Sequence, residues 1–158
     1  MSRPVRPRRS VLYMPGSNPR ALEKARTIPA DGLILDMEDA VAPDAKEPAR
    51  AQIREALKAG GYGRRETIVR VNGLATPWGE ADLAAAATFG ADAVLLPKVE
   101  DADAIRRVES ILNANGAPRD LPIWCMIETP LGVLHAERIA FASPRVGGLV
   151  IGTSDLAK

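Results

Sequence analysis

The chain has 158 residues, a formal net charge of +1 and one cysteine, and 46% of its residues are hydrophobic. A chain of this length and composition can bury a core without disulfides or structural metals, so we expect one globular domain or part of one. The balance of 21 basic and 20 acidic residues gives no support to a nucleic-acid or membrane partner.

The chain begins with a short basic segment. Residues 1–9 lack the apolar core of a signal peptide, which indicates a flexible arm ahead of a domain over residues 10–158. No window approaches eighteen consecutive apolar residues, so we expect no membrane span. Cys125 lies alone in an apolar run, where we expect a buried side chain, and a lone thiol fits the reducing cytoplasm.

Short apolar, β-branched runs recur along the chain and predict six buried strands. They are Val11–Met14, Gly32–Leu35, Thr67–Val71, Ala93–Leu96, Ile123–Ile127 and Gly148–Ile151. The segments between them have helical spacing, and several begin at Asn, Asp, Thr or Pro and end before Gly. These predicted helices are Pro19–Ile28, Asp44–Ala59, Pro77–Phe89, Ala102–Asn115 and Leu131–Phe141.

The alternation of strands and helices predicts a parallel sheet, and strands that are apolar throughout should be covered on both faces. An open doubly wound sheet and a (β/α)8 TIM barrel both fit this pattern. Every predicted strand ends in charged residues or glycine, which is typical of a barrel, whose strand ends converge on one catalytic rim. The first exit loop lacks the glycine-rich phosphate motif of open sheets. We therefore favour the barrel.

A closed barrel needs eight strands and typically about 250 residues, whereas this sequence supplies six predicted strands. We expect the N-terminal six β/α units of a barrel, with two sheet edges and part of the core exposed. The missing units would belong to a longer protein or come from a partner segment.

Two carboxylates, Glu128 and Asp155, follow neighbouring predicted strands. Such a pair is the usual minimal protein anchor for Mg²⁺, which keeps its remaining positions for water and substrate oxygens. The alternative is structural. Asp155 would cap the next helix, and Glu128 would pair with Arg70 or Lys98.

A second cluster of acids follows the strand Gly32–Leu35. Asp36 and Glu38 should point to the same side and Asp39 elsewhere, because side chains alternate along extended backbone. Close acids need nearby cations, or they orient water around a metal. A solvated loop is the alternative.

Two basic residues also lie at strand ends. Arg70 would need an anionic partner if buried, either a substrate carboxylate held in bidentate fashion or an internal acid such as Glu38 or Glu128. Lys98 has the same two interpretations, and the residues alone do not choose between them.

The motifs at the strand ends, taken in order, carry a family resemblance. They read RSVLYMPGSNPRALEKA, LILDMEDAV, IVRVNG, LLPKVE, IETPLGVL and GTSDLA, from about Arg9 to the last residue. The succession resembles the HpcH/HpaI aldolase and citrate-lyase β-subunit superfamily, and within it the CitE-like and malyl-CoA lyase branch. The opening R-S-x-L-Y-x-P-G and the D-x-E-D-A-V block favour that branch over the pyruvate-type aldolases.

The resemblance implies a role for each position that matches a family motif. Glu128 and Asp155 would bind Mg²⁺, with Mn²⁺ as a substitute. Arg70 would hold the carboxylate and oxo side of a small 2-keto acid. Asp36 and Glu38 would act with Arg70 in catalysis by orienting that arginine and metal-bound water.

Five further contacts follow from the same resemblance. Gly152, Thr153 and Lys98 would contact the substrate. Arg20 and Lys24, on the first helix, would bind phosphates of coenzyme A, which is part of the substrate.

The implied reaction is the reversible cleavage of a 3-hydroxyacyl-CoA thioester, of the malyl-CoA, citramalyl-CoA or citryl type, to an acyl-CoA and a 2-keto acid. The general base of the family is an Asp near its C-terminus, often from a neighbouring subunit, and we expect it outside this sequence. We also expect a homo-oligomer, a trimer or hexamer. Two alternatives stay open: a class II pyruvate-type aldolase acting on free hydroxy-keto acids, and an inactive barrel fragment that needs a partner segment.

Overall fold

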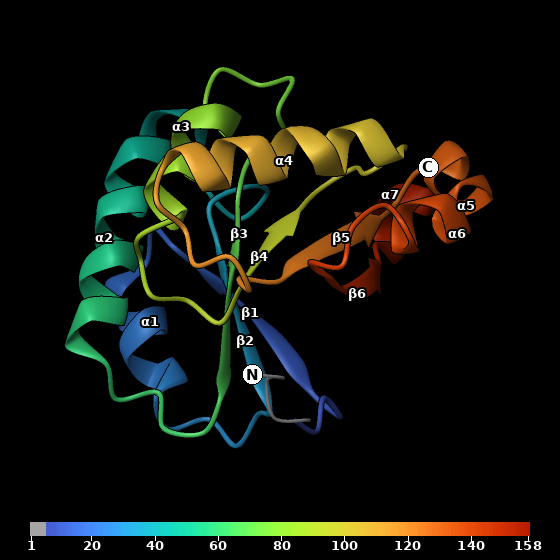
Figure 1. Ribbon diagram of the computed structural model, residues 1–158. Helices are drawn as coiled ribbons and strands as arrows, with labels where there is room; N and C mark the ends of the chain where they lie inside the picture. The colour runs from blue at the N-terminus through green and yellow to red at the C-terminus, as the bar shows by residue number, and fades with distance from the viewer. Residues whose placement is uncertain (1–5) are drawn as a thin grey trace.

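The computed structural model describes residues 6–158, which form a six-stranded parallel sheet with helices packed on it (Figure 1). All six predicted strands are present, and none of their ends differs from the prediction by more than two residues. The strands are β1 (Val11–Pro15), β2 (Gly32–Asp36), β3 (Glu66–Arg70), β4 (Ala93–Leu96), β5 (Ile123–Ile127) and β6 (Val146–Ile151).

The helices follow the predicted segments, and the expected capping residues begin three of them. Asn18, Asp101 and Thr129 each accept a hydrogen bond from a backbone N–H of the first turn, which satisfies a donor that the helix itself leaves unpaired. The helices are α1 (Pro19–Ala25), the 3₁₀ turn η1 (Pro43–Ala45), α2 (Lys46–Ala59), α3 (Gly79–Ala86), α4 (Ala102–Ala114), α5 (Pro130–Leu134), α6 (Ala136–Ala140) and α7 (Thr153–Leu156). Within residues 6–158, no helix has the length and apolar character to cross a membrane.

The prediction of one continuous helix over Leu131–Phe141 is wrong. Two short helices, α5 and α6, replace it, because the backbone of His135 leaves the helical region at φ −101° and ψ 7°. The Nδ1 atom of His135 lies 2.7 Å from the backbone oxygen of Glu100. This contact with the loop before α4 holds the residue at the break.

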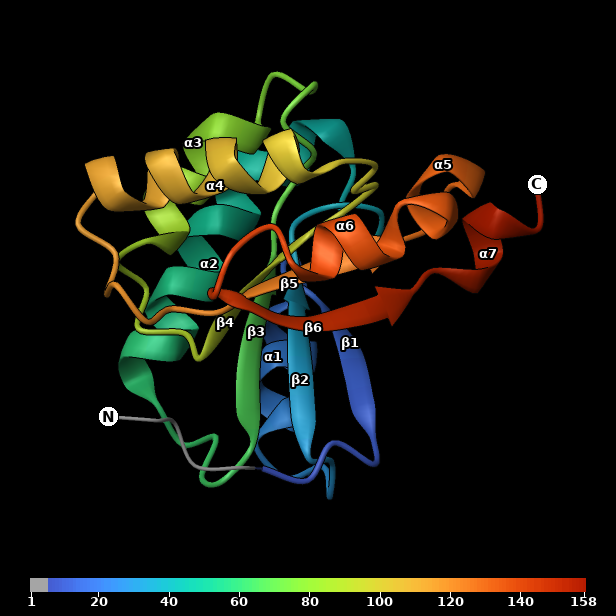
Figure 2. The ribbon, with the colours of Figure 1, turned by 45° about the vertical axis from the view of Figure 1, so that its right-hand side comes forward.

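The order of the strands decides between the two architectures left open by the sequence. Each strand pairs in parallel with the next along the chain, from β1 to β6 in sequence order. A doubly wound sheet reverses its strand order at a switch point, and no reversal occurs here. Right-handed crossovers between successive strands place the helices on one face, and α1 to α4 lie on the same side of the sheet (Figures 1 and 2). The fold is six units of a (β/α)8 barrel wall.

Two apolar layers follow from the alternation of side chains along the strands. Leu33, Leu35, Val69 and Cys125 belong to the outer layer, between the sheet and the helices. The inner layer corresponds to the barrel interior and is made of Ile34, Ile68, Ala93, Leu95, Trp124 and Met126, with Val11 and Val150 packed against it. The expectation that Cys125 is buried is confirmed.

The expected burial of both sheet faces holds for the four central strands, whose residues are all buried. It is wrong for β1 and β6, because these two strands form the edges of the sheet and are only partly covered. Leu12, Leu149 and Ile151 are accordingly 39%, 39% and 58% exposed. The exposed edges agree with the expectation for an unclosed barrel wall.

The expected flexible arm covers residues 1–9, of which residues 1–5 lie outside the described part of the chain. Arg8 donates two hydrogen bonds, of 2.6 and 2.8 Å, to the carboxylate of Glu66 at the start of β3. Its guanidinium lies 4.8 Å from the centre of the Trp124 ring. Arg8 therefore covers the inner layer at the end opposite to the strand exits.

Candidate active site

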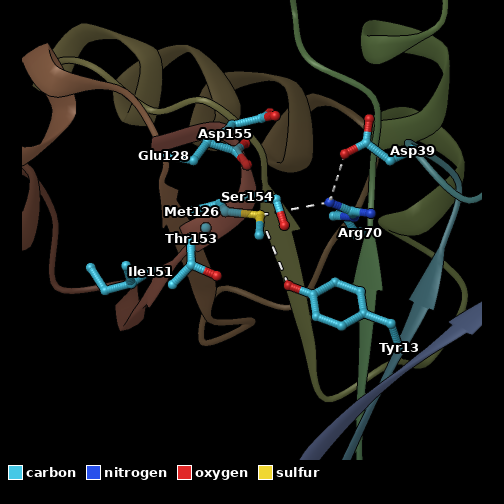
Figure 3. Close-up of a pocket in the computed structure, with 10 residues that line it drawn as sticks. Tyr13, Asp39, Arg70, Met126, Glu128, Ile151, Thr153, Ser154 and Asp155 are labelled. Carbon is cyan, nitrogen blue, oxygen red and sulfur yellow. Dashed lines mark hydrogen bonds and ion pairs between the residues drawn. The ribbon is translucent and has the colours of Figure 1, made fainter. Parts of the chain in front are cut away.

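The loops that follow the strands line an open cavity of about 260 Å³ at the carboxyl ends of β3, β5 and β6 (Figure 3). Tyr13 of β1 also reaches it. The lining residues are Tyr13, Asp39, Arg70, Met126, Glu128, Ile151, Gly152, Thr153, Ser154 and Asp155. The edge at which barrel enzymes place their active sites thus carries a small polar cavity.

Arg70, the last residue of β3, is the most constrained side chain of the site. It is 4% exposed, and its Nε and Nη2 atoms donate to the two carboxylate oxygens of Asp36 at 2.7 and 2.6 Å. Its Nη1 atom lies 2.8 Å from Oε2 of Glu38. Burial opposes the charge, but the hydrogen bonds and charge of Asp36 and the charge of Glu38 outweigh it, so the pKa of Arg70 is raised.

The expected common orientation of Asp36 and Glu38 is confirmed, because both carboxylates contact Arg70. The expectation that Asp39 points elsewhere is wrong. Its carboxylate lines the cavity and lies 3.7 Å from Nη1 of Arg70. Strand alternation cannot place it, because β2 ends at Asp36 and the chain turns over the next residues. Burial raises the pKa of Glu38, with Arg70 acting against this shift.

A buried polar network supports the loop that carries these acids. The ammonium group of Lys46 donates to the backbone oxygens of Met37 and Glu38 at 3.0 and 2.7 Å. The side-chain amide of Asn72 donates to the oxygen of Met37 at 2.8 Å and to the carboxylate of Asp82 at 2.6 Å. Lys46 of α2 and Asp82 of α3 therefore hold the loop, directly or through Asn72. This support fixes the acids in the position from which they orient Arg70.

Glu128 directly follows β5 and is 4% exposed. Its Oε1 atom accepts a 2.8 Å hydrogen bond from the backbone N–H of Lys98. Lys98 has a positive φ of 50°, a conformation that costs energy for a residue with a side chain. Burial raises the pKa of Glu128, against the hydrogen bond from Lys98. The strained residue thus fixes one carboxylate oxygen of Glu128 in the cavity wall.

Asp155 lies inside α7 and does not serve as its N-cap, which is Gly152. The structural alternative of helix capping is therefore wrong. One carboxylate oxygen accepts a 2.6 Å hydrogen bond from Lys158, and the other lies 3.7 Å from the ammonium nitrogen of Lys98. The hydrogen bond from Lys158 lowers the pKa of Asp155.

The donor set fits a divalent cation of the kind that Glu128 and Asp155 were expected to bind. Both carboxylates line the same cavity, and Mg²⁺ is commonly held by one or two protein carboxylates with water and substrate oxygens completing its shell. Residue 152 must be small for this, because a Cβ atom on Gly152 would lie 2.7 Å from Oε2 of Glu128. No cluster of three or more His, Cys, Asp or Glu side chains suited to a metal occurs within residues 6–158.

The chain matches the HpcH/HpaI aldolase/citrate lyase family over residues 9–158. It belongs to this family. It is 50% identical over its whole length to a (3S)-malyl-CoA thioesterase of Cereibacter sphaeroides, of which it covers 53%. It is also 40% identical, over 99% of its length, to the citrate lyase subunit beta of Escherichia coli K12, again covering 53% of that relative.

Solved structures agree with the sequence relatives. The fold superposes with a TM-score of 0.71 and 32% identity on CitE from Mycobacterium tuberculosis in complex with magnesium, acetoacetate and coenzyme A. The match covers 92% of this chain and 49% of that one. The chain therefore spans about half the length of the family members it matches.

The remaining residues expected from the family motifs differ in their distance from the cavity. Gly152 and Thr153 line it, and Lys98 contacts it through its backbone N–H and its ion pair with Asp155. Arg20 and Lys24 are exposed on α1 and are not among the residues that line the cavity. Their contact with coenzyme A stays a prediction.

Three residues of the site were not predicted: Tyr13 and Met126, which face the cavity from β1 and β5, and Lys46, which holds the acidic loop. The sequence could have indicated Tyr13. Side chains alternate along a strand, so Tyr13 lies on the same face of β1 as the apolar residue Val11, two positions earlier. Met126 has no such signal, because it is one apolar residue within an apolar strand.

Proposed function

We propose that the chain carries the metal and 2-keto-acid portion of a Mg²⁺-dependent carbon–carbon lyase, which cleaves a 3-hydroxyacyl-CoA thioester to an acyl-CoA and a 2-keto acid. One observation carries the proposal: Glu128 and Asp155 share a small cavity with Arg70. The carboxylates suit Mg²⁺, and the guanidinium suits an anionic oxygen. The relatives support the proposal, because one is named for the thioester malyl-CoA and the names of CitE structures include magnesium, coenzyme A and the 2-keto acid pyruvate.

The charge of the site favours a cation together with the substrate. Five carboxylates surround three basic side chains, and an anionic substrate would meet net negative charge without a cation. The acidic residues are Asp36, Glu38, Asp39, Glu128 and Asp155, and the basic ones are Arg70, Lys98 and Lys158. Glu128 and Asp155 would hold the ion, which when bound supplies Lewis acidity toward the substrate's hydroxyl and carboxylate oxygens.

Each protein group then has a defined task in the cleavage. Arg70, held by Asp36 and Glu38, presents a fixed N–H toward substrate oxygens and so orients the keto-acid half. During cleavage the substrate hydroxyl gives its proton to a general base, for which the family resemblance implies an Asp, and its oxygen becomes the carbonyl oxygen of the 2-keto acid as the bond between its carbon and the α-carbon of the thioester breaks. The electron pair passes to the acyl-CoA enolate, which takes up a proton.

The expected Mn²⁺ substitution, homo-oligomer and cytoplasmic location stay predictions.

Thioester hydrolysis is a second candidate function. It is favoured by the 50% identity to a protein named (3S)-malyl-CoA thioesterase. In that reaction water would attack the thioester carbonyl, and the products would be the free hydroxy acid and the thiol of coenzyme A. The two functions share the cavity and differ in the bond that breaks.

The test is incubation of the purified chain with malyl-CoA and Mg²⁺, followed by product analysis. The lyase predicts glyoxylate and acetyl-CoA, whereas hydrolysis predicts malate and a free coenzyme A thiol. Glu128→Gln should abolish Mg²⁺ binding and product release without unfolding the chain. Glu137→Gln changes an exposed acid of α6 in the same way and should leave both unchanged.

Three results would contradict the proposal. Malate with free thiol would favour the hydrolase, and cleavage of free hydroxy-keto acids without activity on CoA thioesters would favour a pyruvate-type aldolase. A folded chain that binds no Mg²⁺ would exclude the metal portion itself. A folded, Mg²⁺-binding chain without any product would agree with a barrel segment that needs a partner for turnover.

A further inference from the structure

The loop between β4 and α4, residues 97–101, supports one carboxylate of the candidate metal site. Glu128 lines the cavity together with Asp155 (Figure 3), and its Oε1 atom accepts the backbone N–H of Lys98 at 2.8 Å. This hydrogen bond fixes Oε1, whereas Oε2 lies on the side of Gly152. The position of the loop therefore decides where the carboxylate lies.

Lys98 does not hold this position by itself. Its φ of 50° is a left-handed conformation that costs energy in a residue with a side chain, and such conformations persist only where surrounding contacts impose them. One such contact is the backbone N–H of Val99, which donates to the oxygen of Met126 on β5 at 3.1 Å. Further contacts to the loop come from α5.

Helix α5 approaches the loop at two successive residues. A Cβ atom on Gly132 would lie 2.5 Å from the backbone oxygen of Val99, so the helix lies closer to the loop than a residue with a side chain would allow. Three residues later, Nδ1 of His135 lies 2.7 Å from the backbone oxygen of Glu100. Residues three apart lie on the same face of a helix, so one face of α5 presents both contacts.

The contact of His135 is a hydrogen bond with a defined direction. A carbonyl oxygen only accepts, so Nδ1 carries the proton and donates. The donor lies at the end of α5, which begins two residues after Glu128, and the acceptor belongs to Glu100, two residues after Lys98. This hydrogen bond therefore joins the two segments of the chain that meet at the carboxylate of Glu128.

We propose that His135 is a positioning residue for the metal site: its Nδ1 donates to Glu100 and holds the loop, so that the N–H of Lys98 stays on Glu128. This inference rests on the proposed function, in which Glu128 is a ligand of Mg²⁺. His135 is not among the residues that line the cavity, so it acts through the loop. Hydrogen bonds that orient a metal ligand typically change metal affinity about 10- to 100-fold when they are removed.

The test is the variant His135→Phe, which keeps a planar ring and removes the donor. We expect calorimetry to show Mg²⁺ binding about tenfold weaker than to the unsubstituted chain. In the metal-free chain, the amide of Lys98 should exchange its hydrogen faster, because the loop no longer holds it on Glu128. His135→Asn, whose side-chain nitrogen can take the place of Nδ1, should restore both values.

Ile139→Val is the matched control for a loss of stability. Ile139 is fully buried on α6, so this variant loosens the packing near His135 and keeps the hydrogen bond to Glu100. It should lower the unfolding midpoint and leave the Mg²⁺ affinity and the exchange of Lys98 unchanged. A second measurement needs no variant: nitrogen NMR of the unsubstituted chain should find the proton of the neutral His135 ring on Nδ1.

The possible failures are distinguishable. Unchanged Mg²⁺ affinity and Lys98 exchange in His135→Phe, or a neutral ring protonated on Nε2, would overturn the inference alone. Equal effects in Ile139→Val would also overturn it, because they would reflect a general loosening of α6. Failure of the unsubstituted chain to bind Mg²⁺ would overturn the proposed function and this inference with it.

Discussion

The buried pair of Asp36 and Arg70 gives the sharpest stability prediction. Asp36 is fully buried and accepts four hydrogen bonds, two from Arg70 and one each from the backbone N–H groups of Glu38 and Ala40. Asp36→Asn preserves the shape but replaces one acceptor oxygen with an NH₂ donor. The new NH₂ group would face N–H groups that now donate to Asp36. The guanidinium of Arg70 would also lose its closest counter-charge.

The expected cost follows from the geometry. Removing one partner of a buried ion pair typically costs about 3 to 5 kcal/mol, because the other charge is left uncompensated. Glu38 stays 2.8 Å from Arg70 and retains part of the compensation, so we expect the lower end, about 3 kcal/mol. For a chain of this size, that loss corresponds to a fall in Tm of about 6 to 12 °C.

Urea unfolding followed by circular dichroism measures this difference. The control is Asp103→Asn, which removes the acid of an exposed Asp–Arg pair with Arg106 on α4, and such pairs contribute about 0 to 1 kcal/mol. A loss below about 1 kcal/mol for Asp36→Asn, or equal losses for both variants, would refute the claim that the buried pair holds Arg70 in place.

Two further predictions concern groups inside the fold. Burial raises the pKa of the Cys125 thiol from 9.0 to about 12. The unfolded thiol therefore ionises first, and the free energy of unfolding should fall as the pH rises from 9.0 toward about 12. Iodoacetamide should modify Cys125 only after unfolding in urea, and rapid modification of the native chain would contradict this. Gly152→Ala would place a Cβ 2.5 Å from Cβ of Glu128, and we expect Mg²⁺ affinity to fall at least about tenfold, or about 1.4 kcal/mol. Gly73→Ala, whose Cβ would have its nearest neighbour at 3.9 Å, should bind Mg²⁺ normally in the same calorimetric titration.

The strands could be predicted from the sequence because each one is a short apolar run, and the four central runs are fully buried. The choice of a barrel also followed, because charged residues and glycine at every strand end indicate one shared rim. The division of α5 from α6 at His135 could not be predicted. It accompanies a contact with the backbone oxygen of Glu100, far away in the sequence, and residues 131–141 have continuous helical spacing.

The candidate site shows a similar division. Glu128, Asp155 and Arg70 could be found because each is a charged residue at, or within four residues of, the carboxyl end of a strand, where barrel enzymes place their sites. The partner of Arg70 could not be chosen, since Glu38 and Glu128 were equally suitable before the loop conformation was known. The position of Asp39 was mispredicted for the same reason, because periodicity stops where β2 ends.

The position of Asp36 changes how Arg70 can act. A bidentate grip on a substrate carboxylate would use the same Nε and Nη2 atoms that bind Asp36 at 2.7 and 2.6 Å. Breaking that pair to bind substrate would leave a buried carboxylate unpaired, at a cost of several kcal/mol. Arg70 is therefore better suited to orienting one substrate oxygen through Nη1 than to neutralising a whole carboxylate. The remaining negative charge of the substrate must be balanced elsewhere in the cavity, and a cation held by Glu128 and Asp155 would balance it.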